Sequence, residues 1–218
     1  MADRAVTTTD ATAGERRRGR PKVVSDARQR DHIVETGRRL LLERGYGRTT
    51  MDEVATRARI SKQTLYRFFA NKSALFAAVV EEHRHSMLAL PGDYDHLPIA
   101  EALKAIVRFD IGAEEDRERH ALLEMAFHES VSHPEIREVI LTHGVELARE
   151  DLARWLEARA RREALAIDDP DTLARILMDM VFGAGRPPPR PGETADPAAR
   201  RRQLGSCIHV FLYGVTPR

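Results

Sequence analysis

The sequence has 218 residues, of which 42% are hydrophobic and 32% are charged, so a wholly disordered chain is excluded. The formal net charge of +1 conceals two oppositely charged parts: residues 1–80 hold 17 basic and 9 acidic residues (net +8), and residues 81–218 hold 18 basic and 25 acidic residues (net −7). There is no run of 18 apolar residues and no apolar leader, and the one cysteine, Cys207, cannot form an internal disulfide; we therefore expect a cytoplasmic protein with no membrane partner.

The first predicted elements are an arm and a helix. Residues 1–24 show no apolar periodicity and contain the basic run 16–22 (RRRGRPK), so we expect a basic flexible arm. Apolar residues then recur at helical spacing over 25–43, with Ser25 or Asp26 as the N-cap and Gly45 just beyond the end. The sequence therefore predicts a first helix with a signal at each end.

Three more helices follow, each with a capping residue. Thr50 and Glu53 have the spacing of a capping box and open a short helix. Ser61 caps a third helix that extends to residue 69, and Asn71 caps a fourth over 72–90.

Beyond residue 91 the pattern predicts five further helices, over 97–113, 118–131, 134–165, 170–184 and 197–215, with a proline-rich loop over 186–196. No segment has the alternation of a strand. We therefore predict an all-α fold of about nine helices. Residues 25–80 would form an N-terminal three-helix helix-turn-helix domain, and residues 81–218 a larger helical domain for effector binding and dimerisation.

The two short helices have the spacing of a helix-turn-helix, in which the second helix enters the major groove of DNA. At 100° per residue, Leu65 and Phe69 face the core. The outer face carries four polar side chains: Gln63, Thr64, Tyr66 and Arg67. Gln and Arg can bond adenine and guanine edges bidentately. Any amphipathic helix has a polar outer face, however, so the pattern alone does not establish DNA contact.

Residues 43–55 (ERGYGRTTMDEVA) and 60–76 (ISKQTLYRFFANKSALF) closely resemble the N-terminal domain of the TetR family of bacterial transcriptional regulators. The resemblance implies a homodimer that binds a palindromic double-stranded DNA operator and is released by a small-molecule effector. By position, it puts the DNA contacts on Thr50, Lys62, Gln63, Thr64, Tyr66, Arg67 and Lys72. Two residues depart from the family pattern: Arg59 stands where the turn usually has Gly, and Phe68 stands where His or Tyr is common, which favours packing there over a phosphate contact.

The arm offers a second mode of DNA contact. Its arginines Arg16, Arg17, Arg18 and Arg20 lie in a sequence that resembles the minor-groove hook of small architectural proteins. A solubilising tail is the alternative, since the whole chain has 31 Arg and only 4 Lys.

The last two predicted helices carry apolar stripes that consist of Leu173, Ile176, Leu177, Met180, Val181, Leu204, Ile208, Phe211 and Leu212. The resemblance implies that such a pair from each subunit forms a four-helix dimer interface. Packing within one chain would explain the same stripes.

The resemblance also implies an effector cavity in the larger domain, residues 81–218, which we call the body. The bulky or polar candidates for lining it are Phe109, Leu123, Met125, Phe127, His128, His143 and Trp155. Residues 122–184 look like those of the AefR-type subgroup, which names no ligand. Met and aromatic residues at helical spacing more often indicate core packing.

Other classes of function are not supported by the sequence. The nine histidines lack metal-ligand spacing, so we expect no metal site and no cofactor. There is no phosphate-binding Gly loop and no nucleophile with a base, so we do not expect an enzyme. The sequence thus predicts a sequence-specific DNA-binding regulator, and the family resemblance implies a repressor. The alternative is a non-specific architectural DNA-binding protein that uses its basic arm.

Overall fold

The computed structural model describes residues 25–163, 165, 167–183 and 196–215. Within these ranges it is all helical, as predicted, and contains no strand. The helices are α1 (Asp26–Arg44), α2 (Met51–Arg57), α3 (Lys62–Phe68), α4 (Lys72–Met87), α5 (Ile99–Ile106), α6 (Ala113–Glu129), α7 (Pro134–Val139), η1 (Ile140–Glu146), α8 (Leu147–Glu163), α9 (Pro170–Phe182) and α10 (Pro197–Val215). Because α7, the π-helical η1 and α8 are continuous, the described residues form nine helices.

The first four helices begin directly after the N-cap residues that the sequence predicted. The Ser25 side chain accepts from Arg28 N, and the Thr50 and Glu53 pair forms a complete capping box. Ser61 and Asn71 cap α3 and α4 in the same way. Each cap satisfies a backbone N–H that a helix start would otherwise leave without an acceptor.

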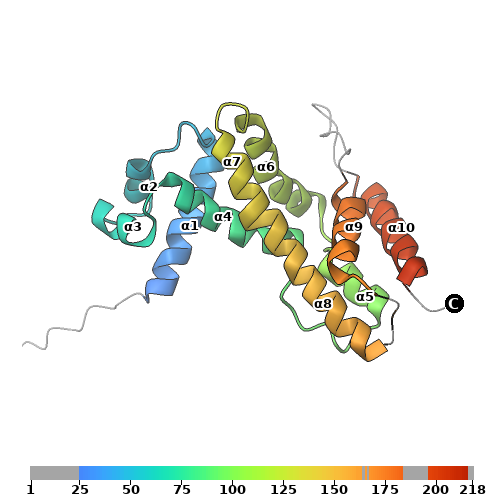
Figure 1. Ribbon diagram of the computed structural model, residues 1–218. Helices are drawn as coiled ribbons and strands as arrows, with labels where there is room; N and C mark the ends of the chain where they lie inside the picture. Colours follow the sequence, from blue (N-terminus) through green and yellow to red (C-terminus); the bar gives the residue numbers. More distant parts are fainter. Residues whose placement is uncertain (1–24, 164, 166, 184–195, 216–218) are drawn as a thin grey trace, which may run out of the picture.

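The described residues form two hydrophobic cores. The first joins α1–α4 to α6 and α7, and it includes Phe76, Leu122 and Ile136. The second joins the segment that follows α4 to α5, α8, α9 and α10, and it includes Leu103 and Leu152. Figure 1 shows α1–α3 at one end of the molecule, α9 and α10 side by side at the other, and α8 running between. The expected domain boundary at residue 80 falls inside α4, whose residues pack in the first core, whereas Leu88 and Leu90, just beyond its end, belong to the second.

The expected helix 97–113 is wrong in its second half. Helix α5 ends at Ile106, and Arg108 has a φ of +53°. The Arg108 guanidinium donates to the backbone oxygen of His85, which holds the turn against the end of α4. Helix α6 then starts at residue 113, five residues earlier than expected, because the acidic residues 114–116 favour a helix N-terminus.

One of those acids, Asp116, is the centre of a buried ion-pair cluster. Its Oδ1 lies 3.3 Å from Arg119 Nε and 3.1 Å from Arg200 Nε, and all three side chains are less than a tenth exposed. Arg200 also donates to the backbone oxygen of Phe109 at 2.8 Å. The cluster therefore ties α10 to the start of α6 and to the turn after α5.

Candidate nucleic-acid interface

Helix α3 has the two-sided character that its sequence predicted. Leu65 is fully buried and Phe69 is 4% exposed, so these two residues fasten the helix to the core. Gln63, Tyr66 and Arg67 are exposed, and Thr64 is half-buried. The outward face of α3 is thus exposed and available for contact with a DNA groove.

Two polar groups of the predicted contact surface already have partners. The Thr64 and Ser61 hydroxyl oxygens lie 2.8 Å apart. The Thr50 hydroxyl accepts from Glu53 N at 3.3 Å and donates to the Glu53 carboxylate at 3.2 Å. Both hydroxyls lie at helix starts, where backbone N–H groups also favour a phosphate.

Each cation of α3 is paired with an acid from another helix. Lys62 Nζ lies 2.7 Å from Asp52 Oδ2 on α2, and Arg67 Nη2 lies 3.0 Å from Asp26 Oδ1 on α1. The neighbouring Asp52 raises the pKa of Lys62. The Arg67 guanidinium also lies over the Phe68 ring, 4.6 Å from its centroid. Phe68 itself packs against the first core, as its departure from the family pattern suggested.

Lys72 is held by the loop between α1 and α2. Its Nζ donates to the backbone oxygen of Tyr46 at 2.8 Å and lies 4.2 Å from the centroid of the Tyr46 ring. Burial is the main cause of the raised pKa of Tyr46. Lys72 therefore positions this loop, and its predicted phosphate contact would use the same ammonium group.

The turn between α2 and α3 has the conformation that a glycine would favour. Arg59 has a φ of +55°, in the left-handed region that costs a side chain-bearing residue free energy. Arg59 N donates to Thr56 O, and Ile60 N donates to Ala55 O. These backbone bonds close the turn.

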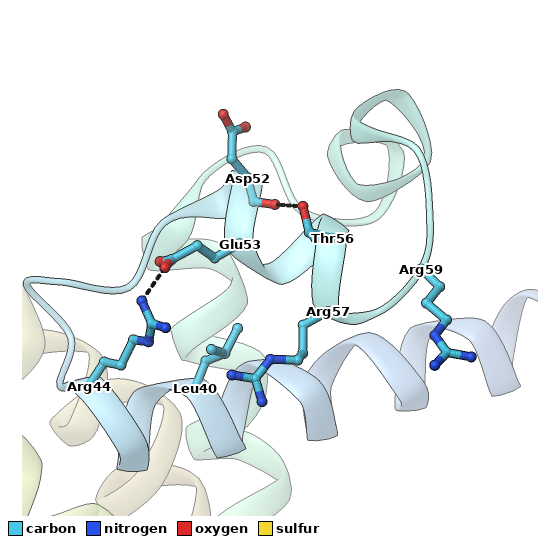
Figure 2. Close-up of a pocket in the computed structure, with 7 residues that line it drawn as sticks. All are labelled: Leu40, Arg44, Asp52, Glu53, Thr56, Arg57 and Arg59. Atoms are coloured by element: carbon cyan, nitrogen blue, oxygen red, sulfur yellow. Dashed lines mark hydrogen bonds and ion pairs between the residues drawn. The ribbon is translucent and has the colours of Figure 1, made fainter.

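Two surface hollows flank the helix-turn-helix. One, of about 600 Å³, is lined by Gln29 of α1 and by Gln63, Thr64 and Arg67 of α3. The other, of about 460 Å³, lies between α1 and α2 and is lined by Leu40, Arg44, Asp52, Glu53, Thr56, Arg57 and Arg59. In Figure 2 Glu53 turns toward Arg44, whereas the carboxylate of Asp52 points away from the other labelled side chains.

The sequence reasoning missed three residues at this surface: Asp26, Gln29 and Asp52. Asp26 and Gln29 share the first turns of α1, and helical spacing could have placed them on one face. Their proximity to α3 depends on how α1 packs in three dimensions, which helical periodicity does not reveal. The predicted arm residues Arg16, Arg17, Arg18 and Arg20 lie outside the described residues.

The effector candidates are divided between the two cores and the surface. Phe127 is 73% exposed and His128 is exposed, so neither lines the interior of this chain. Met125 packs on the first core, whereas Phe109 and Trp155 pack on the second. Leu123 and His143 are half-buried. Their role as effector contacts therefore stays a prediction, and in this chain Phe127 and His128 face outward from α6.

The predicted dimer residues separate into two groups. Five of them are buried in the chain's own core: Leu177, Val181, Leu204, Ile208 and Phe211. Ile176 is 43% exposed, and Leu173, Met180 and Leu212 are half-buried. Packing within the chain thus explains the buried group, and only the second group leaves surface for a partner.

The body contacts the DNA-facing domain through the loop that precedes α2. Glu129 Oε2, at the end of α6, accepts from Gly47 N at 2.6 Å. The His133 ring meets the Tyr46 ring edge to face, with centroids 5.3 Å apart. A Cβ on Gly47 would lie 2.8 Å from His133 Nε2, so a side chain at this position would require the His133 ring to shift.

Within the described part of the chain, no three His, Cys, Asp or Glu side chains are grouped to hold a metal ion. None of the helices found there has both the length and the apolarity needed to cross a bilayer.

These features define a helix-turn-helix DNA-binding protein. They are a capped two-turn helix, a tight turn and a second helix that exposes Gln, Tyr and Arg side chains. Comparison with known families identifies it further. The profile described as "Bacterial regulatory proteins, tetR family" matches residues 33–79, and that described as "AefR-like transcriptional repressor, C-terminal domain" matches residues 101–214. The second match covers more than half of the chain. The protein therefore belongs to the TetR family of transcriptional regulators, and its body is of the AefR-like type, as the sequence resemblance predicted.

Similar proteins agree with this assignment. The uncharacterized HTH-type transcriptional regulator YvkB of Bacillus subtilis is 26% identical over 160 residues, which are 69% of this chain and 78% of YvkB. A putative TetR-family regulator from Mesorhizobium loti has a similar structure, with a TM-score of 0.62 and 20% identity over 89% of this chain and all of that one. The flavonoid-responsive regulator FrrA has a TM-score of 0.58 and 25% identity over 88% of this chain and 99% of its own.

Proposed function

We propose that this regulator is an operator-binding repressor that acts as a homodimer and releases DNA when a small molecule binds its body. The carrying observation is the outward face of α3, where Gln63, Tyr66 and Arg67 are exposed above the buried Leu65. Gln and Arg have the donors and acceptors to distinguish adenine and guanine edges, and Tyr66 suits a phosphate oxygen. The AefR-like repressor profile supports repression over activation.

The distribution of charge also favours an orientation in which α3 faces the DNA. Residues 25–80 hold eleven basic and six acidic residues, a net +5, whereas residues 81–218 are net −7. The end of the molecule that carries α3 is therefore attracted to phosphate, and the body is repelled.

The test is selection from a randomised duplex library, followed by fluorescence anisotropy on the enriched duplex and on a scrambled duplex of the same composition. We expect a preference for the enriched, two-fold symmetric sequence that persists as salt rises. The rival function, non-specific architectural binding, predicts a steep salt dependence and equal affinity for both duplexes.

The basic arm is a separate part of the proposal. If its arginines contact the minor groove or phosphates, removal of residues 1–22 will weaken binding and flatten the salt dependence. Equal affinity and equal slope for the truncated chain would remove the arm from the interface.

Dimerisation is supported by the outer faces of α9 and α10. Ile176 and Val210 are 43% and 60% exposed, and the half-buried Leu173 and Met180 extend this apolar surface. A second copy would remove it from water, and two copies would present two recognition helices to a two-fold operator. Sedimentation equilibrium of Val210→Glu tests the surface. We expect this variant to be monomeric at concentrations where Thr142→Glu, which adds the same charge on η1, remains dimeric.

Effector release is supported by FrrA, a protein of similar structure whose name describes it as flavonoid-responsive. We propose Met125, Phe109 and Trp155 as the effector-facing candidates, because they are the members of the predicted set that pack within the body. Trp155 is the strongest, since its buried Nε1 has no acceptor among the described residues and a buried indole N–H usually bonds.

The contact of Glu129 with Gly47 N gives ligand binding a route to α2 and α3. A ligand releases DNA only if it binds more tightly to a conformation that fits the operator less well. The experiment is a thermal-shift screen of small molecules, in which any ligand that stabilises the protein is tested for displacement of the selected duplex. Stabilisation of the wild type but not of Trp155→Phe would support the assignment of Trp155.

A further inference from the structure

The charges of the recognition helix are balanced by two acids that belong to other helices. The α3 sequence contains two cations, Lys62 in its first turn and Arg67 in its last. Lys62 Nζ lies 2.7 Å from Asp52 Oδ2, and Arg67 Nη2 lies 3.0 Å from Asp26 Oδ1. The surface that faces DNA in the proposed function is therefore close to neutral at α3.

These pairs contribute little to the stability of the fold. The four side chains are between 56% and 72% exposed, and ion pairs at such exposed positions are weak and screened by salt. Neither acid is needed to neutralise a buried charge. Their effect should therefore be sought in what the two cations do when another anion approaches.

Their positions place both acids next to the reading surface. Asp26 is the first residue of α1, one turn before Gln29, which lines a hollow together with Gln63 and Arg67. The Asp52 carboxylate points away from the other labelled side chains in Figure 2 and reaches Lys62 at the start of α3. A phosphate that approached either cation would meet a carboxylate at the same place.

We propose that Asp26 and Asp52 are specificity-determining residues of this regulator, and the inference rests on the proposed binding of α3 to DNA. Each acid competes with phosphate for one cation, so binding to any duplex is weakened. Each also holds its cation on one side, so that a guanine edge or a correctly placed phosphate is preferred to a phosphate in a random register. Affinity is thus lowered most for DNA of the wrong sequence.

The experiment compares Asp26→Asn, Asp52→Asn and the double variant in the full chain. Asp31→Asn is the matched control, since Asp31 is an exposed acid of α1 that forms no ion pair among the described residues. Affinity is measured by anisotropy between 0.1 and 0.3 M salt, about the range in which counterion release dominates, for the library-selected duplex and for its scrambled counterpart. Melting temperatures are recorded in parallel.

We expect each Asn variant to free one cation for a phosphate of the scrambled duplex. One more released counterion steepens the slope of log K against log salt by about 0.9. If the variant and the wild type bind the scrambled duplex equally at 1 M salt, the variant will bind it about fivefold more tightly at 0.15 M salt. The selected duplex should gain less, so the ratio of the two affinities should fall severalfold, and further in the double variant. Asp26→Glu keeps the charge and should preserve the ratio.

Two results would overturn the inference in distinguishable ways. If the wild type prefers the selected duplex but the Asn variants match Asp31→Asn in slope and in affinity ratio, the acids do not set specificity while the proposed function stands. If the wild type itself shows no preference for any duplex, the proposed function fails and this inference fails with it.

Discussion

The turn of the helix-turn-helix provides a direct test of the backbone argument. Arg59 has a φ of +55°, and its side chain is exposed. The bonds that close the turn, from Arg59 N to Thr56 O and from Ile60 N to Ala55 O, are between backbone atoms. Replacement of Arg59 by Gly therefore changes the conformational cost of the turn without removing one of these bonds.

The expected magnitude follows from two opposing effects. A left-handed conformation costs an L-residue about 1–2 kcal/mol, which Gly avoids. Gly also has more backbone freedom in the unfolded chain, which offsets about 0.4–1 kcal/mol. The net stabilisation by Arg59→Gly should therefore be about 0.5–1 kcal/mol, and each kcal/mol corresponds to about 2–4 °C in melting temperature for a chain of this size.

The assay is urea unfolding at fixed protein concentration, because the stability of a dimer depends on concentration. Arg59→Ala is the control: it removes the same side chain but keeps a Cβ in the left-handed region. Arg59→Gly should have the higher unfolding midpoint of the two. If Arg59→Gly is no more stable than Arg59→Ala, the left-handed conformation carries no cost here and the reasoning is refuted.

Three further predictions concern contacts in and around the body. Glu129→Ala removes the acceptor of Gly47 N and should lower the free energy of unfolding by about 1–2 kcal/mol in urea titrations. Glu129→Gln keeps an acceptor oxygen and should lose much less stability. Equal losses in the two variants would mean that this hydrogen bond does not hold the loop. Burial lowers the pKa of His83 to about 4, so below pH 6.5 the unfolded chain takes up a proton that the native chain refuses until about pH 4. His83 should therefore cost up to about 3 kcal/mol of stability as the pH falls through that window, and His83→Gln should be less acid-sensitive than the wild type when urea midpoints at pH 7 and pH 4.5 are compared; parallel losses would contradict this. Asp116→Asn leaves the buried Arg119 and Arg200 without their shared carboxylate and should cost about 3–5 kcal/mol by calorimetry or urea unfolding, whereas Glu114→Gln, at an exposed position in the same turn, should cost far less; a small effect of Asp116→Asn would mean that other groups neutralise the cluster.

The parts of the fold that the sequence predicted are those that local chemistry decides. Ser25, Thr50, Ser61 and Asn71 each bond a backbone N–H within three residues, so the helix starts could be located from spacing alone. Leu65 and Phe69 lie one helical turn apart, and their burial followed from the period of 3.6 residues. The outward face of α3 followed by elimination.

The errors in the body have a common cause. The helix expected over 97–113 ends at Ile106 because Arg108 reaches the backbone oxygen of His85, and such a contact leaves no mark in the pattern of neighbouring residues. Phe127 has a large apolar side chain of the kind that usually packs in a core, yet it is 73% exposed. Apolar periodicity shows that a helix has a buried face, but not which other helix covers it.

The sequence by itself determined the all-helical class, the position of the helix-turn-helix, the family and the residues that face outward from α3, because these depend on caps, turns and periodicity within a few residues. Tertiary structure decided which charges meet. Asp26 and Arg67 are 41 residues apart in the chain and Gly47 and Glu129 are 82 apart. Ion pairs and hydrogen bonds act over a few ångströms of space, so the neutralised recognition helix and the link from body to loop exist only once α1, α2, α3 and α6 have packed together.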